Sequence, residues 1–309
     1  MRTQTKGALF VMMAGVLWGT TGIIVKTIYA VTTMGPVSVS FFRIIVALPF
    51  LAGLVIAKRY DLSMTSRELV LFAAFGFCSL TLFVILYFAS FAYTTVQHAA
   101  ALLYTAPAFV ALLSWIILKE PMTRAKVTAV ALSVLGAILV VGIFRGGQLF
   151  ASRTEIGDWL ALISGLTYST WYIFGKVLGK NREPAVVCFV GMCFGALFLF
   201  LITFVVGGLQ VPTNDAGWGL LLLQGLVPTT FAYLLYLTGL RLIDATSASV
   251  FAIVEPVTAV ILGFLFFQET LSYDSLLGFA LIVSSILLVS LTTNSARPST
   301  ENVASAIRR

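Results

Sequence analysis

The sequence predicts an all-α integral membrane protein with ten transmembrane helices, arranged as two inverted five-helix repeats. Three observations predict this fold: an unusually apolar composition, a series of apolar segments long enough to span a bilayer, and an internal duplication. Of the 309 residues, 60% are hydrophobic and only 10% are charged, whereas about a quarter of an ordinary soluble chain is charged. Lipid must therefore be the solvent for most of this chain.

A helix needs about 20 apolar residues to cross the hydrocarbon core of a bilayer, and ten segments meet this length. The first, from Ala8 to Ile28, is not followed by a small-residue cleavage motif, so we expect it to remain in the protein. Residues 93–96 and 241–244 leave room only for tight helical hairpins. The expected spans are 7–28, 36–57, 69–92, 97–118, 125–144, 157–179, 185–207, 217–240, 245–267 and 274–292.

The duplication is clearest between residues 82–120 and 231–269, which align at a constant offset of 149. The aligned residues pair as Tyr87 with Tyr236, Ala99 with Ala248, Pro107 with Pro256 and Glu120 with Glu269. A weaker echo at an offset of 150 pairs Gly15 with Gly165 and Lys26 with Lys176. We therefore expect one repeat at 7–144, a second at 157–292, and a polar, disordered cytoplasmic tail at 293–309.

The distribution of cations predicts the orientation in the membrane. If the N terminus is cytoplasmic, 15 Lys and Arg residues lie on the cytoplasmic side and three, Lys26, Arg145 and Arg153, lie outside. Because cytoplasmic loops are enriched in Lys and Arg, we expect both termini to lie in the cytoplasm. We expect the protein to reside in the inner (plasma) membrane of the cell. Five spans per repeat is an odd number, so the second repeat enters the membrane upside down.

Four short motifs carry a resemblance to a known family. They are WGTTGIIVK from Trp18, PVSVSFFR ending at Arg43, the AP turn at Pro107 followed by KEP, and the EP turn at Pro256 followed by QET. Together, and over residues 7–292, the chain resembles the EamA-type ten-helix exporters of the drug/metabolite transporter superfamily. Within that family it looks most like the YddG-type branch, and this resemblance implies export of amino acids and related compounds.

Two ionisable residues lie well inside predicted spans, away from the span ends, where a charge costs several kcal/mol unless it is paired or hydrated. Arg43 is suited to bind a substrate carboxylate through its two-pronged guanidinium; the alternative is a structural role in which it snorkels or caps backbone carbonyls. Glu255 precedes Pro256, which leaves the carbonyl of Ala252 without its helical partner and predicts a break in that helix. Glu255 is suited to bind an ammonium group or a proton; the alternative is a structural ion pair with Arg43. Pro107 predicts the corresponding break in the first repeat.

Aromatic residues recur at helical spacing on several spans and predict a cavity wall for an apolar side chain or a cation. The alternative for such residues is packing against lipid or neighbouring helices. His98, the only histidine, is suited either to sense protons or to cap its helix. The aromatic candidates are Trp18, Phe83, Tyr87, Tyr104, Tyr168, Trp171, Tyr233 and Tyr236.

Several function classes are disfavoured by the absence of their motifs. The sequence contains no GxxxxGK[ST] loop, no HExxH pair and no GxSxG elbow, so we expect neither ATP hydrolysis, a metal site, a cofactor nor enzyme activity. The net charge of +7 is spread between apolar segments, which indicates membrane topology and not nucleic-acid binding.

The sequence therefore predicts a secondary transporter that exports small metabolites, foremost amino acids, by alternating access. The alternative is a multidrug exporter of the same fold, for lipophilic or quaternary cations. The expected partners are a small-molecule substrate and the lipid bilayer. Spans 125–144 and 274–292 carry few polar groups, so we expect them outside the pore as packing surfaces or as the interface of a homodimer.

Overall fold

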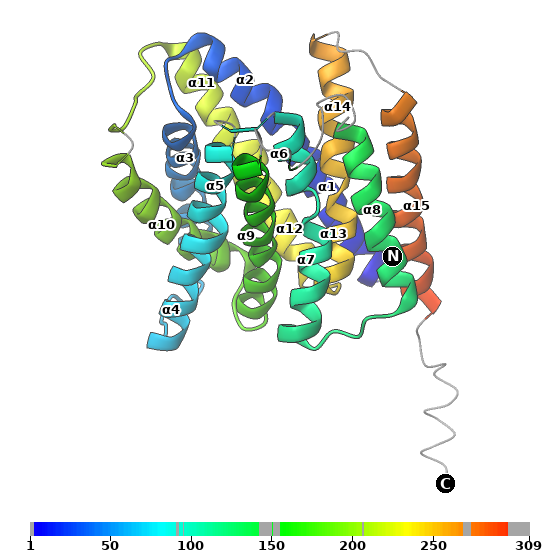
Figure 1. The fold of residues 1–309 in the computed structure, drawn as a ribbon. Helices are drawn as coiled ribbons and strands as arrows, with labels where there is room; N and C mark the ends of the chain where they lie inside the picture. The colour runs from blue at the N-terminus through cyan, green and yellow to red at the C-terminus, as the bar shows by residue number, and fades with distance from the viewer. Residues whose placement is uncertain are drawn as a thin grey trace.

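The computed structural model is a bundle of helices, and it describes residues 3–90, 93–94, 96–141, 150, 155–205, 207–267 and 273–295. No strand occurs within these ranges. The helices run up and down past one another, and α2 lies across one end of the bundle (Figure 1). The α-helices are α1 Thr3–Gly19, α2 Thr21–Val31, α3 Pro36–Ala57, α4 Ser66–Phe75, α5 Phe83–Ser90, α6 Val96–Leu103, α7 Ala106–Leu113, α8 Arg124–Val141, α9 Glu155–Gly179, α10 Pro184–Thr203, α11 Asp215–Gln224, α12 Ala232–Leu240, α13 Ala245–Ala252, α14 Val254–Phe267 and α15 Tyr273–Ser295. Three π-helical segments complete the set: η1 Gly76–Leu82, η2 Ser114–Leu118 and η4 Gly225–Phe231.

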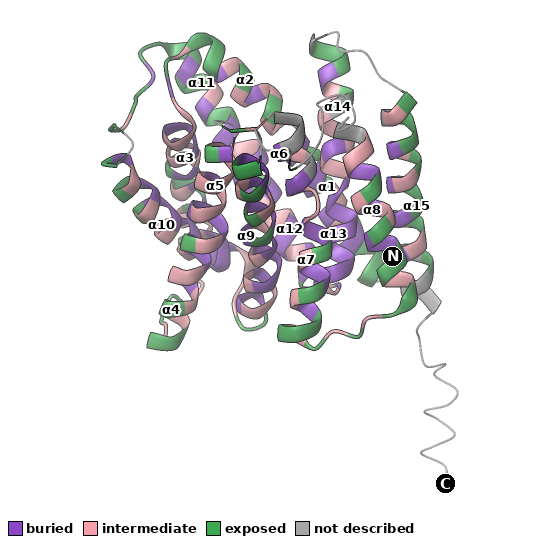
Figure 2. Cartoon of the chain, viewed as in Figure 1, coloured by how far each residue is buried: buried purple, intermediate pink, exposed green. Residues whose placement is uncertain are grey.

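Six helical segments of the described chain are long and apolar enough to cross a membrane, and two more are apolar but shorter. The long ones are Thr3–Val31, Pro36–Ala57, Ser66–Ser90, Pro184–Thr203, Asp215–Leu240 and Ala245–Phe266, and the shorter ones are Ala106–Leu118 and Leu276–Val289. An all-helical membrane fold is thus confirmed, while the count of ten spans and the inverted orientation stay predictions. Buried residues follow the inner faces of α1, α9 and α13, and exposed residues gather on the outer faces of α8 and α15 (Figure 2).

Helix α15 continues to Ser295, three residues into the tail expected at 293–309. The bounds of the two repeats and of the tail stay predictions. Residues 296–309, Glu269 and most of the join at 145–156 lie outside the described residues.

Several predicted spans are interrupted. The span predicted at 97–118 is broken between α6 and α7, and that at 245–267 is broken at Ile253 between α13 and α14. Each break lies two to three residues before a proline, Pro107 or Pro256, whose ring nitrogen cannot donate to the carbonyl four residues earlier. At the first break, the Thr105 hydroxyl donates to the Leu102 carbonyl at 2.6 Å, so part of the open turn is satisfied by a side chain.

The π-helical segments η1 and η4 occupy the same place in the two halves of the chain, which the sequence analysis did not predict. In η1 the Thr81 hydroxyl donates to the Gly76 carbonyl at 3.0 Å, and in η4 Thr230 donates to Gly225 at 2.8 Å. Each hydroxyl reaches back five residues and satisfies a carbonyl in the widened turn. Single π-helical turns inside α-helices are frequent at functional sites.

Two glycines bring the first helix of each half against the broken helix of the other half. A Cβ atom on Gly15 of α1 would lie 2.9 Å from the Ala252 carbonyl oxygen, and one on Gly165 of α9 would lie 3.1 Å from that of Leu102. Small residues let membrane helices approach closely. These two contacts therefore hold the breaks, and the side chains beside them, in the middle of the bundle.

Candidate substrate-binding site

A cavity of about 540 Å³ lies inside the bundle, between α1, α2, α3, α5, α9, α12 and α14. It reaches the exposed side chains of Lys26 and Tyr29 on α2 and so opens at that end of the molecule. Nine of the residues predicted from sequence line it: Trp18, Arg43, Phe83, Tyr87, Tyr104, Tyr168, Trp171, Tyr233 and Glu255. The fold thus brings together candidates that lie more than two hundred residues apart in the chain.

Arg43 projects into the cavity from the second turn of α3. The side chain is half-buried, and its Nε atom is buried without a hydrogen-bond partner among the described residues. Tyr233 lines the same cavity, and its ring packs against those of Trp18 and Trp171 with centroids 5.4 and 4.5 Å away. Arg43 therefore keeps its Nε donor available for a ligand.

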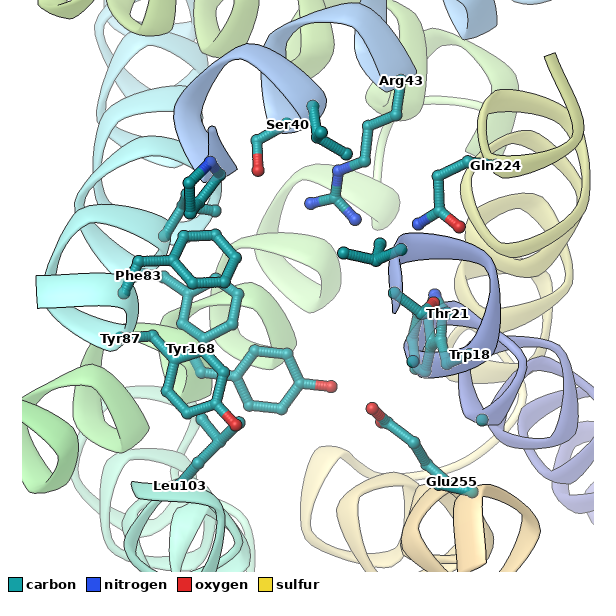
Figure 3. A pocket seen from close by; sticks show the side chains of 18 of the residues that line it. Trp18, Thr21, Ser40, Arg43, Phe83, Tyr87, Leu103, Tyr168, Gln224 and Glu255 are labelled. Carbon is teal, nitrogen blue, oxygen red and sulfur yellow. The ribbon is translucent and has the colours of Figure 1, made fainter. Parts of the chain in front are cut away.

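Glu255 enters the cavity from the opposite wall, in the first turn of α14 directly after the helix break (Figure 3). The first turn of a helix carries unpaired N–H groups and the positive end of the helix dipole, which favour a carboxylate there. Tyr168 lines the same cavity on the wall that faces this carboxylate (Figure 3). In the described part of the chain no ion pair joins Glu255 to Arg43, so the structural pairing considered above does not occur.

The side wall of the cavity is aromatic. The ring of Phe83 stacks on that of Tyr87 with centroids 5.8 Å apart and lies 5.1 Å from that of Tyr168. Figure 3 shows these three rings on one side of the cavity, facing Trp18 and Glu255. Such a wall accepts an apolar side chain or, through the ring faces, a cation.

Tyr236 does not line the cavity but forms part of its floor. It is fully buried, and its ring centroid lies 5.2 Å from that of Trp18 and 5.3 Å from that of Tyr172. Trp171, only 2% exposed, covers it with a centroid distance of 6.0 Å. Helical spacing alone placed Tyr236 on the same stripe as Tyr233, but the packed rings above it separate it from the cavity.

The two predicted prolines contribute to the helices and not to the lining of the cavity. Pro107 and Pro256 are buried in the first turns of α7 and α14. His98 lies on α6, and its side chain is outside the described residues.

The structure adds a residue that sequence reasoning missed. Gln224, the last residue of α11, lines the cavity near Arg43, is fully buried, and has no hydrogen-bond partner for either amide atom among the described residues. The available signal was a lone amide inside the predicted span 217–240, close to a proline. An uncharged amide is less conspicuous in an apolar span than an ionisable or aromatic side chain, so Gln224 was not predicted.

The end of the bundle opposite the cavity mouth is held together by polar contacts. The Glu120 carboxylate accepts from the backbone N–H groups of Ala245 at 2.9 Å and Thr246 at 3.4 Å, at the start of α13. Lys126 pairs with Asp244 at 3.1 Å. On the neighbouring helix, the Lys176 ammonium donates to the Leu240 carbonyl at 2.7 Å and also to that of Ile243. These contacts tie α8, α9 and the α12–α13 turn into a closed end.

The sequence model of the EamA-like transporter family matches this chain twice, over residues 5–142 and 155–291. The chain belongs to the EamA-like transporter family. It is therefore a membrane transporter of the drug/metabolite transporter superfamily and not an enzyme.

Its similarity to individual family members extends along nearly the whole chain. An uncharacterized transporter of Archaeoglobus fulgidus is 27% identical over 93% of this chain and 97% of its own length. The uncharacterized transporter YwfM of Bacillus subtilis and the protein PecM of Dickeya dadantii are each 26% identical, over 92% and 91% of this chain and 93% and 91% of theirs. A protein of known crystal structure superposes with a TM-score of 0.81 at 18% identity, covering 95% of this chain and 99% of that one. The fold of this chain is thus shared with that solved protein.

Proposed function

We propose that this EamA-like transporter exports small metabolites, foremost amino acids, across the inner membrane by alternating access. The observation that carries the proposal is a guanidinium and a carboxylate on facing walls of one cavity, Arg43 and Glu255, with no ion pair between them in the described chain. Opposite charges that are held apart inside a membrane protein are costly. A zwitterion bound between them would neutralise both.

The chemistry of the cavity fits an amino acid. A carboxylate accepts two parallel hydrogen bonds from a guanidinium, and an ammonium group is complementary to the Glu255 carboxylate. Charge-assisted hydrogen bonds of this kind contribute about 1.5–3 kcal/mol each. The aromatic wall of Phe83, Tyr87 and Tyr168 would receive the side chain.

The proposed topology has ten spans in two inverted repeats, 7–144 and 157–292, with both termini and the tail in the cytoplasm. In this orientation the cavity mouth beside α2 faces outward, and the closed end with Glu120 and Lys126 faces the cytoplasm. Two residues paired by the repeat lie in different environments: Tyr87 lines the cavity, while its counterpart Tyr236 is buried in the floor. This difference supports an exchange of conformations between the two repeats. An inverted pair of repeats that exchange conformations would close one end and open the other.

Counterflow in proteoliposomes tests the proposal. Purified protein is reconstituted with an unlabelled amino acid inside, and uptake of the same labelled amino acid is measured. We expect saturable exchange that is lost in Arg43→Gln and Glu255→Gln. Arg67→Gln and Glu155→Gln are matched controls, because both side chains are exposed outside the cavity, and they should transport like the unmodified protein.

A parallel assay with quaternary ammonium compounds distinguishes the alternative function. The aromatic wall beside a carboxylate is also a suitable site for a lipophilic cation. Movement of such cations that depends on Glu255 but not on Arg43, with no amino-acid exchange, would replace the amino-acid proposal by multidrug export.

A further inference from the structure

Gln224 is a buried amide for which the protein offers no partner. It is 0% exposed, and neither its Nε2 nor its Oε1 atom has a hydrogen-bond partner among the described residues. Buried polar groups are nearly always hydrogen-bonded, and one left unsatisfied destabilises the fold. A glutamine at this place therefore needs an explanation other than stability.

Gln224 lies directly against Arg43. A Cβ atom on the next residue, Gly225, would lie 3.0 Å from the Arg43 carbonyl oxygen, so the two backbones touch at this point. Figure 3 shows the Gln224 amide and the Arg43 guanidinium projecting into the same end of the cavity. Because the Arg43 Nε atom is also without a partner, this end presents unsatisfied donors from both side chains and one acceptor.

The backbone at Gln224 is held in place by the π-helical segment that follows it. Pro228 cannot donate to the Gln224 carbonyl, and the Thr229 hydroxyl does so instead at 2.8 Å. The amide is thus presented from a rigid turn. A cavity-facing group on such a support is pre-organised for a ligand.

The other half of the chain fills the corresponding place with apolar atoms. Helices α3 and α10 both begin with a proline, and counted from those prolines Gly191 corresponds to Arg43. The repeat register equates Phe75 with Gln224, and the Phe75 ring lies against Gly191. In the other half, the phenyl ring of Phe75 therefore fills this position without any polar group. Helix packing alone does not require polar side chains here, so the Arg43–Gln224 pair points to a ligand.

We propose that Gln224 and Arg43 together form the carboxylate-binding subsite of this transporter, and that they select α-amino acids. The Nε2 amide of Gln224 donates to the carboxylate that Arg43 binds, and its Oε1 atom accepts an N–H from the neighbouring α-ammonium group. The ammonium carries three donors, so it can serve Gln224 and a second acceptor such as Glu255 together. This inference rests on the proposed function, which it narrows to substrates whose carboxylate and ammonium are adjacent.

Binding of three matched ligands to the purified protein tests the subsite. The ligands are L-phenylalanine, phenethylamine, which lacks the carboxylate, and 3-phenylpropionate, which lacks the ammonium. Trp18 and Trp171 line the cavity, so their fluorescence is a readout of binding. Gln224→Leu should weaken binding of phenylalanine by about 10- to 100-fold. It should weaken binding of phenethylamine and of 3-phenylpropionate by a smaller factor, about 3- to 10-fold, because each of them makes only one of the two Gln224 contacts.

The control and a second readout separate loss of a ligand contact from loss of structure. Gln4→Leu changes the same residue type on the exposed start of α1 and should alter no ligand. Because Gln224→Leu removes unsatisfied buried groups, its melting temperature without ligand should be no lower than that of the unmodified protein.

Each remaining outcome counts against one proposal. Unchanged phenylalanine binding in Gln224→Leu, equal losses for all three ligands, or no binding of phenylalanine to the unmodified protein would overturn the subsite. Phenylalanine binding that depends on Gln224, without counterflow in proteoliposomes, would leave the subsite standing and overturn the proposed export function.

Discussion

Replacement of Gly15 by alanine should force α1 away from the break between α13 and α14. The added Cβ would lie 2.9 Å from the Ala252 carbonyl oxygen and 3.4 Å from the Glu255 nitrogen. Both are backbone atoms, so no side-chain rotation relieves the contact, and overpacking of this kind costs about 1–3 kcal/mol. Alanine favours a helix interior over glycine by about 1 kcal/mol. We therefore expect Gly15→Ala to lower the free energy of unfolding by up to about 2 kcal/mol.

Gly53 provides the matched control. It also lies inside a helix, α3, but a Cβ there would meet no atom within 4 Å. Gly53→Ala should therefore be neutral or stabilising by up to about 1 kcal/mol. Gly165→Ala, whose Cβ would lie 3.1 Å from the Leu102 carbonyl oxygen, should fall between the two.

The measurement is the free energy of unfolding of each variant, from denaturant titration of the purified protein in detergent micelles. The expected order of stability is Gly53→Ala, then Gly165→Ala, then Gly15→Ala. Equal stability of the Gly15 and Gly53 variants, within about 0.5 kcal/mol, would refute the close approach of α1 to the broken helix.

Three further predictions concern single contacts. Thr229→Ala should cost about 0.5–1.5 kcal/mol, because it removes the hydrogen bond from the Thr229 hydroxyl to the Gln224 carbonyl, and Thr229→Ser should restore most of the loss in the same titration. A double-mutant cycle on Lys126 and Asp244 should give a coupling free energy of about 0.2–1 kcal/mol. In the double variant, cysteines placed at the closed end should react faster with a water-soluble thiol reagent. Unchanged reactivity would show that this ion pair does not hold the end closed. Hydrogen bonds from Ser63 lower the pKa of Asp61, so their stabilisation of the fold is present above the ordinary carboxyl pKa and is lost as the pH falls through the lowered pKa. The difference in melting temperature between the unmodified protein and Ser63→Ala should therefore shrink on acidification. A difference that stays constant with pH would contradict this.

Much of the candidate site could be predicted because its signals are local. A charge within an apolar span is conspicuous in a sequence, and Arg43 and Glu255 both line the cavity. A proline removes a known hydrogen bond wherever it stands in a helix, and the helices are broken near Pro107 and Pro256 as their positions indicated. Helical spacing also identified Phe83, an aromatic residue of the cavity wall.

The same reasoning failed where the outcome depends on neighbours from distant helices. Tyr233 and Tyr236 share a helical stripe, and rings from α1 and α9 pack against both, but only Tyr233 lines the cavity. The π-helical segment before Phe83 was not predicted, since the preference for a wide turn over a regular one depends on what the helix packs against.

The sequence by itself determined the solvent of this protein, its duplication and its family, because apolar content, repeat register and short motifs are properties of the chain alone. Only the tertiary structure decided which polar groups are left without partners. Arg43 and Glu255 were equally consistent with an ion pair until the fold placed them on opposite walls, and Gln224 became a candidate only when its amide was found buried beside Arg43. Hydrogen-bond satisfaction depends on atoms brought together from remote segments, and no local pattern contains that information.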